Sequence, residues 1–80
     1  MELRVLKYFL MVAREENITK AAALLHLTQP TLSRQLMQLE EELGVRLIDR
    51  NTRSLSLTRA GHIFYQRAEQ ILGMLHAAAD

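Results

Sequence analysis

Apolar residues recur at helical spacing in three stretches of the chain, and each stretch predicts an amphipathic helix. The first stretch runs roughly from Glu2 to Arg14. In the second, four leucines fall within roughly 60° of arc when the chain turns by about 100° per residue. These leucines are Leu32, Leu36, Leu39 and Leu43. The third stretch begins near residue 59 and continues to the C-terminus, and its apolar positions span roughly half of the helix circumference.

Capping residues and turn formers place helix boundaries and add a short helix. Thr19 is predicted to be the N-cap of a helix from Lys20 to about Leu25, and a tight turn at residues 26–27 follows. Thr28 is predicted to cap the next helix, whose first turn contains Pro30, where a missing N–H costs nothing. A short helix, a tight turn and a longer helix with a polar start are typical of a helix-turn-helix motif.

The helical period stops after Gly44, a residue type that commonly ends a helix. A short strand is predicted at residues 45–48, and a second at residues 54–57, where serine and leucine alternate. The intervening residues 49–53 are polar and turn-prone, and Thr58 is predicted to cap the last helix. The predicted fold class is all-α with a small β-hairpin wing, a winged helix-turn-helix followed by a long helix.

The composition is that of one small domain, with 80 residues, 49% of them apolar, and a net charge of +1. The absence of cysteine excludes a disulfide scaffold and a cysteine-based zinc finger, and it suits a reducing cytoplasm. The longest apolar run, from Tyr8 to Ala13, is far shorter than the roughly 20 residues of a membrane span. Charged residues near the start indicate no secretory signal. The near-neutral charge by itself does not indicate a nucleic-acid partner.

The polar face of the helix after Thr28 is the main candidate for binding chemistry. Its first turn carries hydroxyl and amide side chains at the positive end of the helix dipole, and these are Thr28, Gln29, Thr31 and Ser33. Arg34 lies almost opposite the leucine stripe, and residues 40–42 form an acidic far end. Such a helix start suits phosphate, and glutamine and arginine can read base edges in a major groove. The plain alternatives are a solvated Gln29, an Arg34 that pairs with Gln38, and Thr28 as a cap alone.

Longer motifs carry a resemblance to a known family. Three of them lie in the helical stretches: Thr19-Lys20-Ala21-Ala22, Leu25-His26-Leu27-Thr28-Gln29-Pro30-Thr31-Leu32-Ser33-Arg34-Gln35 and Leu39-Glu40-Glu41-Glu42-Leu43-Gly44. Two more lie in and after the hairpin: Leu47-Ile48-Asp49-Arg50 and Leu57-Thr58-Arg59-Ala60-Gly61. Over essentially all 80 residues, the chain resembles the N-terminal DNA-binding domain of LysR-type transcriptional regulators. It departs from the usual pattern at Ile48, where phenylalanine is common, and at Thr52, where glycine is common.

The resemblance implies sequence-specific binding to double-stranded DNA, at an interrupted palindrome, by a bacterial transcription regulator in the cytoplasm, at the nucleoid. The recognition helix, about residues 29–43, would lie in the major groove, and Arg53 of the wing would enter the minor groove. The residues that would read bases are Gln29, Pro30, Thr31 and Arg34. The residues that would contact phosphates are Thr19, Lys20, Thr28, Ser33 and Arg50. For Arg50, an ion pair with a carboxylate at the edge of the core is an equal alternative.

The apolar arc of the last helix is wider than the arc that one small domain covers. Packing against the first helix accounts for part of it, and the remainder is expected to pair with the same helix of a second chain, as linker helices of the family do. The residues predicted to dimerise are Phe64, Ala68, Ile71, Leu72 and Leu75. Residues 1–58 are thus assigned to the winged helix-turn-helix domain and residues 59–80 to the linker helix.

The resemblance also implies features of a longer protein. A C-terminal effector-binding domain is expected to be absent from this chain, and a small-molecule co-inducer would bind only through that domain. A homodimer is expected, with a tetramer as a further option for the full-length chain.

Two other classes of function stay open from the residues alone. A helical protein-interaction module would bind a different protein through the apolar side of the last helix and would ignore changes at Gln29 and Arg34. An enzyme would need a catalytic grouping, and no Ser/His/Asp arrangement, paired carboxylates or Gly-rich phosphate loop is visible. His62 and His76 lie about 21 Å apart along the last helix, so no metal and no cofactor is expected.

Overall fold

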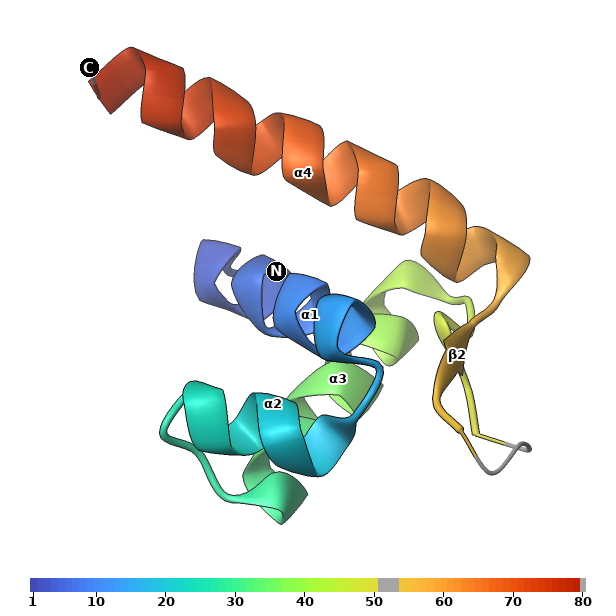
Figure 1. Ribbon diagram of the computed structural model, residues 1–80. Coiled ribbons are helices and arrows are strands. Elements are labelled where there is room, and N and C mark those ends of the chain that lie inside the picture. Colours follow the sequence, from blue (N-terminus) through green and yellow to red (C-terminus); the bar gives the residue numbers. More distant parts are fainter. Residues whose placement is uncertain (51–53, 80) are drawn as a thin grey trace.

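Figure 1 shows the computed structural model of the chain, which describes residues 1–50 and 54–79. Over these residues, helices are followed by a short hairpin and by one long helix. In chain order the elements are α1 (Leu3–Glu15), α2 (Ile18–Leu24), α3 (Gln29–Leu43), β1 (Ile48–Asp49), β2 (Ser56–Leu57) and α4 (Arg59–Ala79). The predicted order of elements and the predicted fold class are confirmed. None of the described helices is both long and apolar enough to span a membrane.

Helix α1 lies between the other helices and contributes to two apolar clusters. Phe9 is fully buried in the first cluster, which α1 forms with α2, α3 and the hairpin. Leu6 and Leu10 belong to the second cluster, which α1 forms with α4. The Phe9 ring also meets the ring of Phe64 on α4 edge to face, with centroids 5.4 Å apart. One amphipathic helix with a wide apolar stripe therefore holds both the helix-turn-helix unit and the long helix.

Helix α2 begins before the position that the sequence predicts. Asn17 is its N-cap, because the side-chain oxygen of Asn17 accepts a hydrogen bond from the backbone N–H of Lys20 at 2.9 Å. Asparagine is a stronger N-cap than threonine, and its extended backbone turns the chain into the helix soon after α1 ends. The prediction of Thr19 as the cap is therefore wrong, and Thr19 lies in the first turn of α2.

Helix α3 begins and ends where the sequence predicts. Thr28 is the N-cap, since its hydroxyl oxygen accepts a hydrogen bond from the Thr31 backbone N–H at 3.3 Å. Pro30 lies in the first turn, and Gly44 ends the helix with a φ of 73°. The leucine stripe is buried, apart from a partly exposed Leu43. Because this stripe faces the core, the opposite side of α3 is left in contact with solvent.

The hairpin strands pair antiparallel, with Ile48 opposite Leu57. The second strand lies within the predicted stretch, but the first begins at Ile48 and not at Val45. Val45 is exposed, whereas the buried Leu47 donates its backbone N–H to the carboxylate of Glu40 at 2.7 Å. The burial of Leu47 before the first strand therefore accompanies its attachment to α3 and not strand pairing.

Helix α4 is capped by Thr58, as the sequence predicts, and runs in the opposite direction to α1 (Figure 1). The Thr58 hydroxyl accepts a hydrogen bond from the Gly61 backbone N–H at 3.0 Å and donates one to the carbonyl of Arg46. Gly61 lies directly against the hairpin: a Cβ there would overlap the Leu47 carbonyl oxygen and lie 3.2 Å from the Leu57 Cβ. The start of α4 is thus fastened to the residues that precede β1.

The structure corrects part of the predicted dimerisation surface on α4. Ala68 and Leu72 are buried against α1 of the same chain, and Phe64 is half-buried in the same region. The helical period places these three side chains on the side of α4 that faces α1, so they are core residues of this chain. Ile71 and Leu75 remain exposed, at 41% and 43%, and their role in dimerisation stays a prediction.

Candidate nucleic-acid interface

The first turn of α3 is a polar, solvent-facing helix start. The Thr28 hydroxyl donates a hydrogen bond to the Thr31 hydroxyl at 2.8 Å, in addition to capping the Thr31 backbone N–H. The Gln29 side-chain amide donates to the Ser33 hydroxyl at 2.7 Å. These bonds order the side chains of one turn at the end of the helix where the dipole is positive. The predicted residues of this turn therefore lie together and near solvent.

The predicted base-reading residues differ in exposure. Gln29, Pro30 and Arg34 are exposed, whereas Thr31 is half-buried. No hydrogen bond or ion pair within residues 1–50 and 54–79 involves Arg34, so the alternative of a pairing with Gln38 is not realised there. The Arg34 guanidinium thus keeps its fork of N–H donors available for a ligand.

The start of α2 carries the two predicted phosphate contacts that precede α3. Thr19 and Lys20 are both exposed in the first turn of the helix. The Lys20 ammonium nitrogen lies 3.2 Å from a carboxylate oxygen of Glu15, in an ion pair that is mostly exposed on the lysine side. Exposed pairs of this kind are weak, so Lys20 can exchange Glu15 for a phosphate at little cost.

The start of α2, the first turn of α3 and the hairpin meet around one groove with a volume of about 260 Å³. Its lining includes Ile18 of α2, Gln29 and Ser33 of α3, and Arg50, which follows β1. Fold topology therefore brings Arg50 next to the polar start of α3. Three of the predicted site residues, Gln29, Ser33 and Arg50, share this groove.

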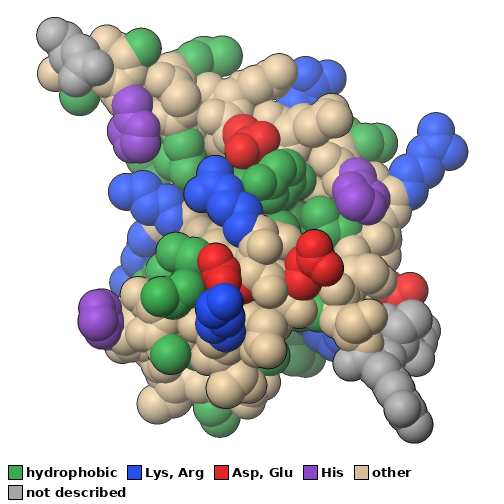
Figure 2. All heavy atoms as spheres, in the orientation of Figure 1, with side chains coloured by type: hydrophobic (Ala, Val, Ile, Leu, Met, Phe, Trp, Pro, Cys, Tyr) green, Lys and Arg blue, Asp and Glu red, His purple; other side chains and the backbone are tan. Residues whose placement is uncertain are grey.

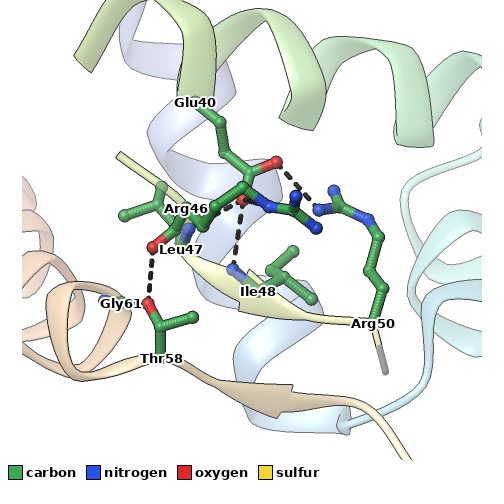
Figure 3. A network of polar contacts seen from close by, with 7 residues as sticks. All are labelled: Glu40, Arg46, Leu47, Ile48, Arg50, Thr58 and Gly61. Carbon is green, nitrogen blue, oxygen red and sulfur yellow. Dashed lines mark hydrogen bonds and ion pairs between the residues drawn. The ribbon is translucent and has the colours of Figure 1, made fainter. Parts of the chain in front are cut away.

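Arg50 forms an ion pair with a buried carboxylate, which is the alternative that the sequence left open. Its Nη1 lies 2.9 Å from Oε1 of Glu40, whose side chain is 8% exposed (Figure 3). Arg50 itself is about one-third exposed, at 34%. Part of the guanidinium therefore still faces solvent, and contact with a phosphate stays a prediction for this residue.

Glu40 is a residue of the site that sequence reasoning missed. The sequence groups it with Glu41 and Glu42 in an acidic helix end, but Glu40 is buried while its two neighbours are exposed. A signal for this difference exists in the helical period. Glu40 follows Leu36 by four residues, so it lies only about 40° from that leucine and on the core side of α3.

The face formed by α1, α2 and α4 carries mixed charge. In Figure 2, which shows the molecule in the orientation of Figure 1, Lys or Arg and Asp or Glu side chains lie beside one another on this face. Arg14 of α1, for example, pairs with Glu69 of α4 at 3.3 Å. Arg14 also donates a hydrogen bond to the Tyr65 hydroxyl, which raises the pKa of Arg14. Paired charges attract a polyanion weakly, so the α3 side is the better candidate interface.

Arg53, the predicted minor-groove residue, lies outside the described residues. The contact of Arg53 with a minor groove is therefore a proposal from the sequence alone.

Comparison with known proteins assigns the chain to a family. The profile described as bacterial regulatory helix-turn-helix protein, lysR family, matches residues 3–62. The probable cat1 operon transcriptional activator of Acinetobacter lwoffii is 53% identical over 73 residues, which make up 91% of this chain and 24% of that protein. The regulator BudR of Klebsiella aerogenes is 50% identical over 80 residues, which make up 100% of this chain and 56% of BudR. The chain thus spans only about a quarter and about half of these relatives.

A solved structure shares both the fold and much of the sequence. The crystal structure of a BenM DBD/benA site 1 DNA complex superposes with a TM-score of 0.95 at 47% sequence identity, covering 99% of this chain and 89% of that one. BenM is an HTH-type transcriptional regulator of Acinetobacter baylyi. The family profile, the relatives and the superposed fold agree along nearly the whole chain. This chain therefore belongs to the lysR family of bacterial regulatory helix-turn-helix proteins.

Proposed function

We propose that this chain binds double-stranded DNA sequence-specifically, as the DNA-binding part of a bacterial transcriptional regulator. The observation that carries the proposal is the polar start of α3. There Gln29 and Arg34 are exposed beside the N-terminus of the helix, and Arg34 forms no hydrogen bond or ion pair with the described residues. The similarity to a BenM domain in a DNA complex supports it further. We propose no catalytic role for the chain.

In this proposal, phosphate contacts orient the protein and base contacts give specificity. Phosphates lie against the first turns of α2 and α3, where the positive end of the α3 dipole adds to the attraction. The residues that bind them are Thr19, Lys20, Thr28, Ser33 and Arg50. Helix α3 lies in the major groove with Gln29, Pro30, Thr31 and Arg34 toward the base edges. A guanidinium at the position of Arg34 suits guanine, which it can bind through two parallel hydrogen bonds. Arg53 of the wing enters the minor groove.

A second copy of the chain pairs through α4. The 21 residues of α4 make it roughly 31 Å long, whereas the 13 residues of α1 span roughly 20 Å, so α4 extends beyond α1 (Figure 1). Exposed apolar side chains lie away from the α1 contact, and these are Ile63, Ile71, Met74 and Leu75. A two-fold pairing of this stripe presents two α3 helices to successive major grooves of an interrupted palindrome.

The remaining proposals concern the full-length protein, because the chain spans only part of its relatives. A small-molecule co-inducer binds through a further, C-terminal domain, and the full-length chain forms a homodimer or a tetramer. The protein acts in the cytoplasm, at the nucleoid.

The test is a fluorescence anisotropy titration of the 80-residue chain with two duplexes, one selected from a random library and one scrambled. The chain is expected to bind the selected duplex at least about a hundredfold more tightly than the scrambled duplex. If a dimer neutralises about eight phosphates, affinity falls by roughly four decades between about 50 and 200 mM salt. Arg34→Ala is expected to weaken selective binding by about 1–3 kcal/mol and to leave binding to the scrambled duplex nearly unchanged.

Arg4→Ala is the matched control for Arg34→Ala. Arg4 lies in the first turn of α1 and pairs with Glu2 at 3.2 Å. This end of α1 lies near the C-terminal end of α3, because the amino group of Met1 pairs with Glu42 at 3.1 Å. Arg4→Ala removes the same charge as Arg34→Ala, but roughly 20 Å from the start of α3, and is expected to change DNA affinity little. Absence of wild-type binding at low salt, with the fold intact, would overturn the proposal in favour of a protein-interaction module.

A further inference from the structure

Glu40 connects the recognition helix to the hairpin through both of its carboxylate oxygens (Figure 3). Its Oε2 accepts hydrogen bonds from the backbone N–H groups of Leu47 at 2.7 Å and Ile48 at 3.2 Å. Its Oε1 lies 2.9 Å from Nη1 of Arg50. One oxygen therefore anchors the start of β1, and the other holds the arginine that follows β1.

A second guanidinium lies next to the same carboxylate. Nε of Arg46 is 4.0 Å from Oε2 of Glu40, and the Arg46 side chain is 66% exposed. Two arginines therefore lie around one buried carboxylate at the junction of α3 and the hairpin. Both arginines also line, together with the exposed Glu41, a groove with a volume of about 400 Å³ beside the exposed side of α3. The junction thus brings two guanidinium groups to one buried carboxylate.

We infer that Glu40 is a positioning residue for DNA binding, which holds Arg50 and Arg46 where their remaining N–H groups meet a backbone phosphate. The inference rests on the proposed function. A guanidinium has five N–H donors, and the ion pair of Arg50 with Glu40 through Nη1 occupies only part of this set. An arginine already held in place loses less rotamer freedom when it binds, so the same contact contributes more affinity.

The direction in which one substitution changes DNA affinity distinguishes a positioning role from simple electrostatic repulsion. Removal of any carboxylate near DNA lowers the repulsion of a polyanion, so charge alone predicts tighter binding. Positioning by Glu40 predicts weaker binding instead. Glu40→Gln is well suited to the test, because its amide oxygen can still accept the N–H groups of Leu47 and Ile48. Its NH2 group, however, cannot accept a hydrogen bond from Arg50.

The experiment compares Glu40→Gln with Glu41→Gln in the 80-residue chain, by anisotropy titration with the selected and scrambled duplexes over a series of salt concentrations. Glu41 is the matched control, because it is the next residue of α3, is exposed, lines the same groove, and forms no side-chain hydrogen bond or ion pair with the described residues. Glu40→Gln is expected to lower affinity about tenfold for both duplexes and to reduce the slope of log affinity against log salt by about one per chain. Glu41→Gln is expected to raise affinity slightly without reducing the slope.

A loss of folded protein would lower the binding-competent fraction, which a stoichiometric titration measures, but it would leave the salt slope of the remainder unchanged. Arg50→Gln keeps the backbone bonds of Glu40 and is expected to reproduce the reduced slope, with no further loss in the double variant Glu40→Gln/Arg50→Gln. If Glu40→Gln does not fold, the inference is tested by the slopes of log affinity against log salt for Arg50→Gln and Arg46→Gln. Slopes equal to that of the wild type in both variants would overturn the inference. Tighter binding by Glu40→Gln, at an unchanged slope, would also overturn it. If the wild type binds DNA but the variants show no reduced slope, the proposed function stays intact and only the inference about Glu40 fails. If the wild type does not bind DNA, the proposed function and the inference both fail.

Discussion

Gly61 lies in the first turn of α4 directly against the backbone that precedes β1. The Leu47 carbonyl oxygen, which a Cβ at this position would overlap, also accepts a hydrogen bond from the Thr58 backbone N–H at 3.0 Å. Gly73 lies in the same helix, but nothing surrounds the place where its Cβ would be. At the scale of residues, two glycines of one helix therefore differ: the position of Gly61 has no room for a Cβ, whereas that of Gly73 has.

Gly61→Ala is expected to destabilise the fold by about 1–3 kcal/mol, because the hairpin backbone must move to admit the methyl group. Gly73→Ala is expected to stabilise it by up to about 1 kcal/mol, since alanine has the higher helix propensity and meets no neighbour. Urea denaturation followed by circular dichroism measures both changes. A Gly61→Ala protein as stable as the wild type would contradict the close contact.

At the scale of elements, each helix begins and ends at a local signal, and the signals differ in how well they can be predicted. The bounds of α3 follow from Thr28, Pro30 and Gly44, because each acts within one turn of the helix. The start of α2 is harder to predict, since Asn17 and Thr19 are both competent caps. The end of α1, where Glu16 adopts a φ of 53°, brings Asn17 and not Thr19 to the capping position.

Asn17→Ala is expected to destabilise the protein by about 1 kcal/mol, because the backbone N–H of Lys20 loses its acceptor. Thr19→Ala is the control, and it is expected to change stability by less than about 0.5 kcal/mol, since Thr19 lies exposed inside the first turn. The midpoints of thermal unfolding for the two variants give the comparison. A larger loss for Thr19→Ala would restore Thr19 as the cap.

At the scale of the whole molecule, the apolar surface of α4 divides into two parts. One part packs on α1 and includes Ala68 and Leu72. The other includes Ile71 and Met74 and is exposed in a single chain. The predicted packing of part of the apolar arc against α1 is confirmed, but periodicity alone does not show which side chains make that contact. That division depends on the direction from which α1 packs against α4.

Ile71→Glu is expected to weaken self-association at least tenfold while the fold is retained, because it places a charge in the exposed stripe and not in the core. Gln66→Glu adds the same charge on another side of α4 and is expected to leave self-association unchanged. Sedimentation equilibrium of both variants measures the effect. Identical behaviour of the two variants would place the dimer contact elsewhere.

The sequence by itself determined the order of elements, the bounds of α3, the cap of α4 and the polar start of α3, because these depend on interactions within a few residues. The tertiary structure alone decided the partners of the Glu40 carboxylate, the close approach of Gly61 to Leu47 and the division of the α4 surface. Each of these features joins groups that are distant in the chain, such as the Glu40 carboxylate and the Arg50 guanidinium. A helical period shows which side of a helix is apolar, but only packing shows which neighbour meets that side.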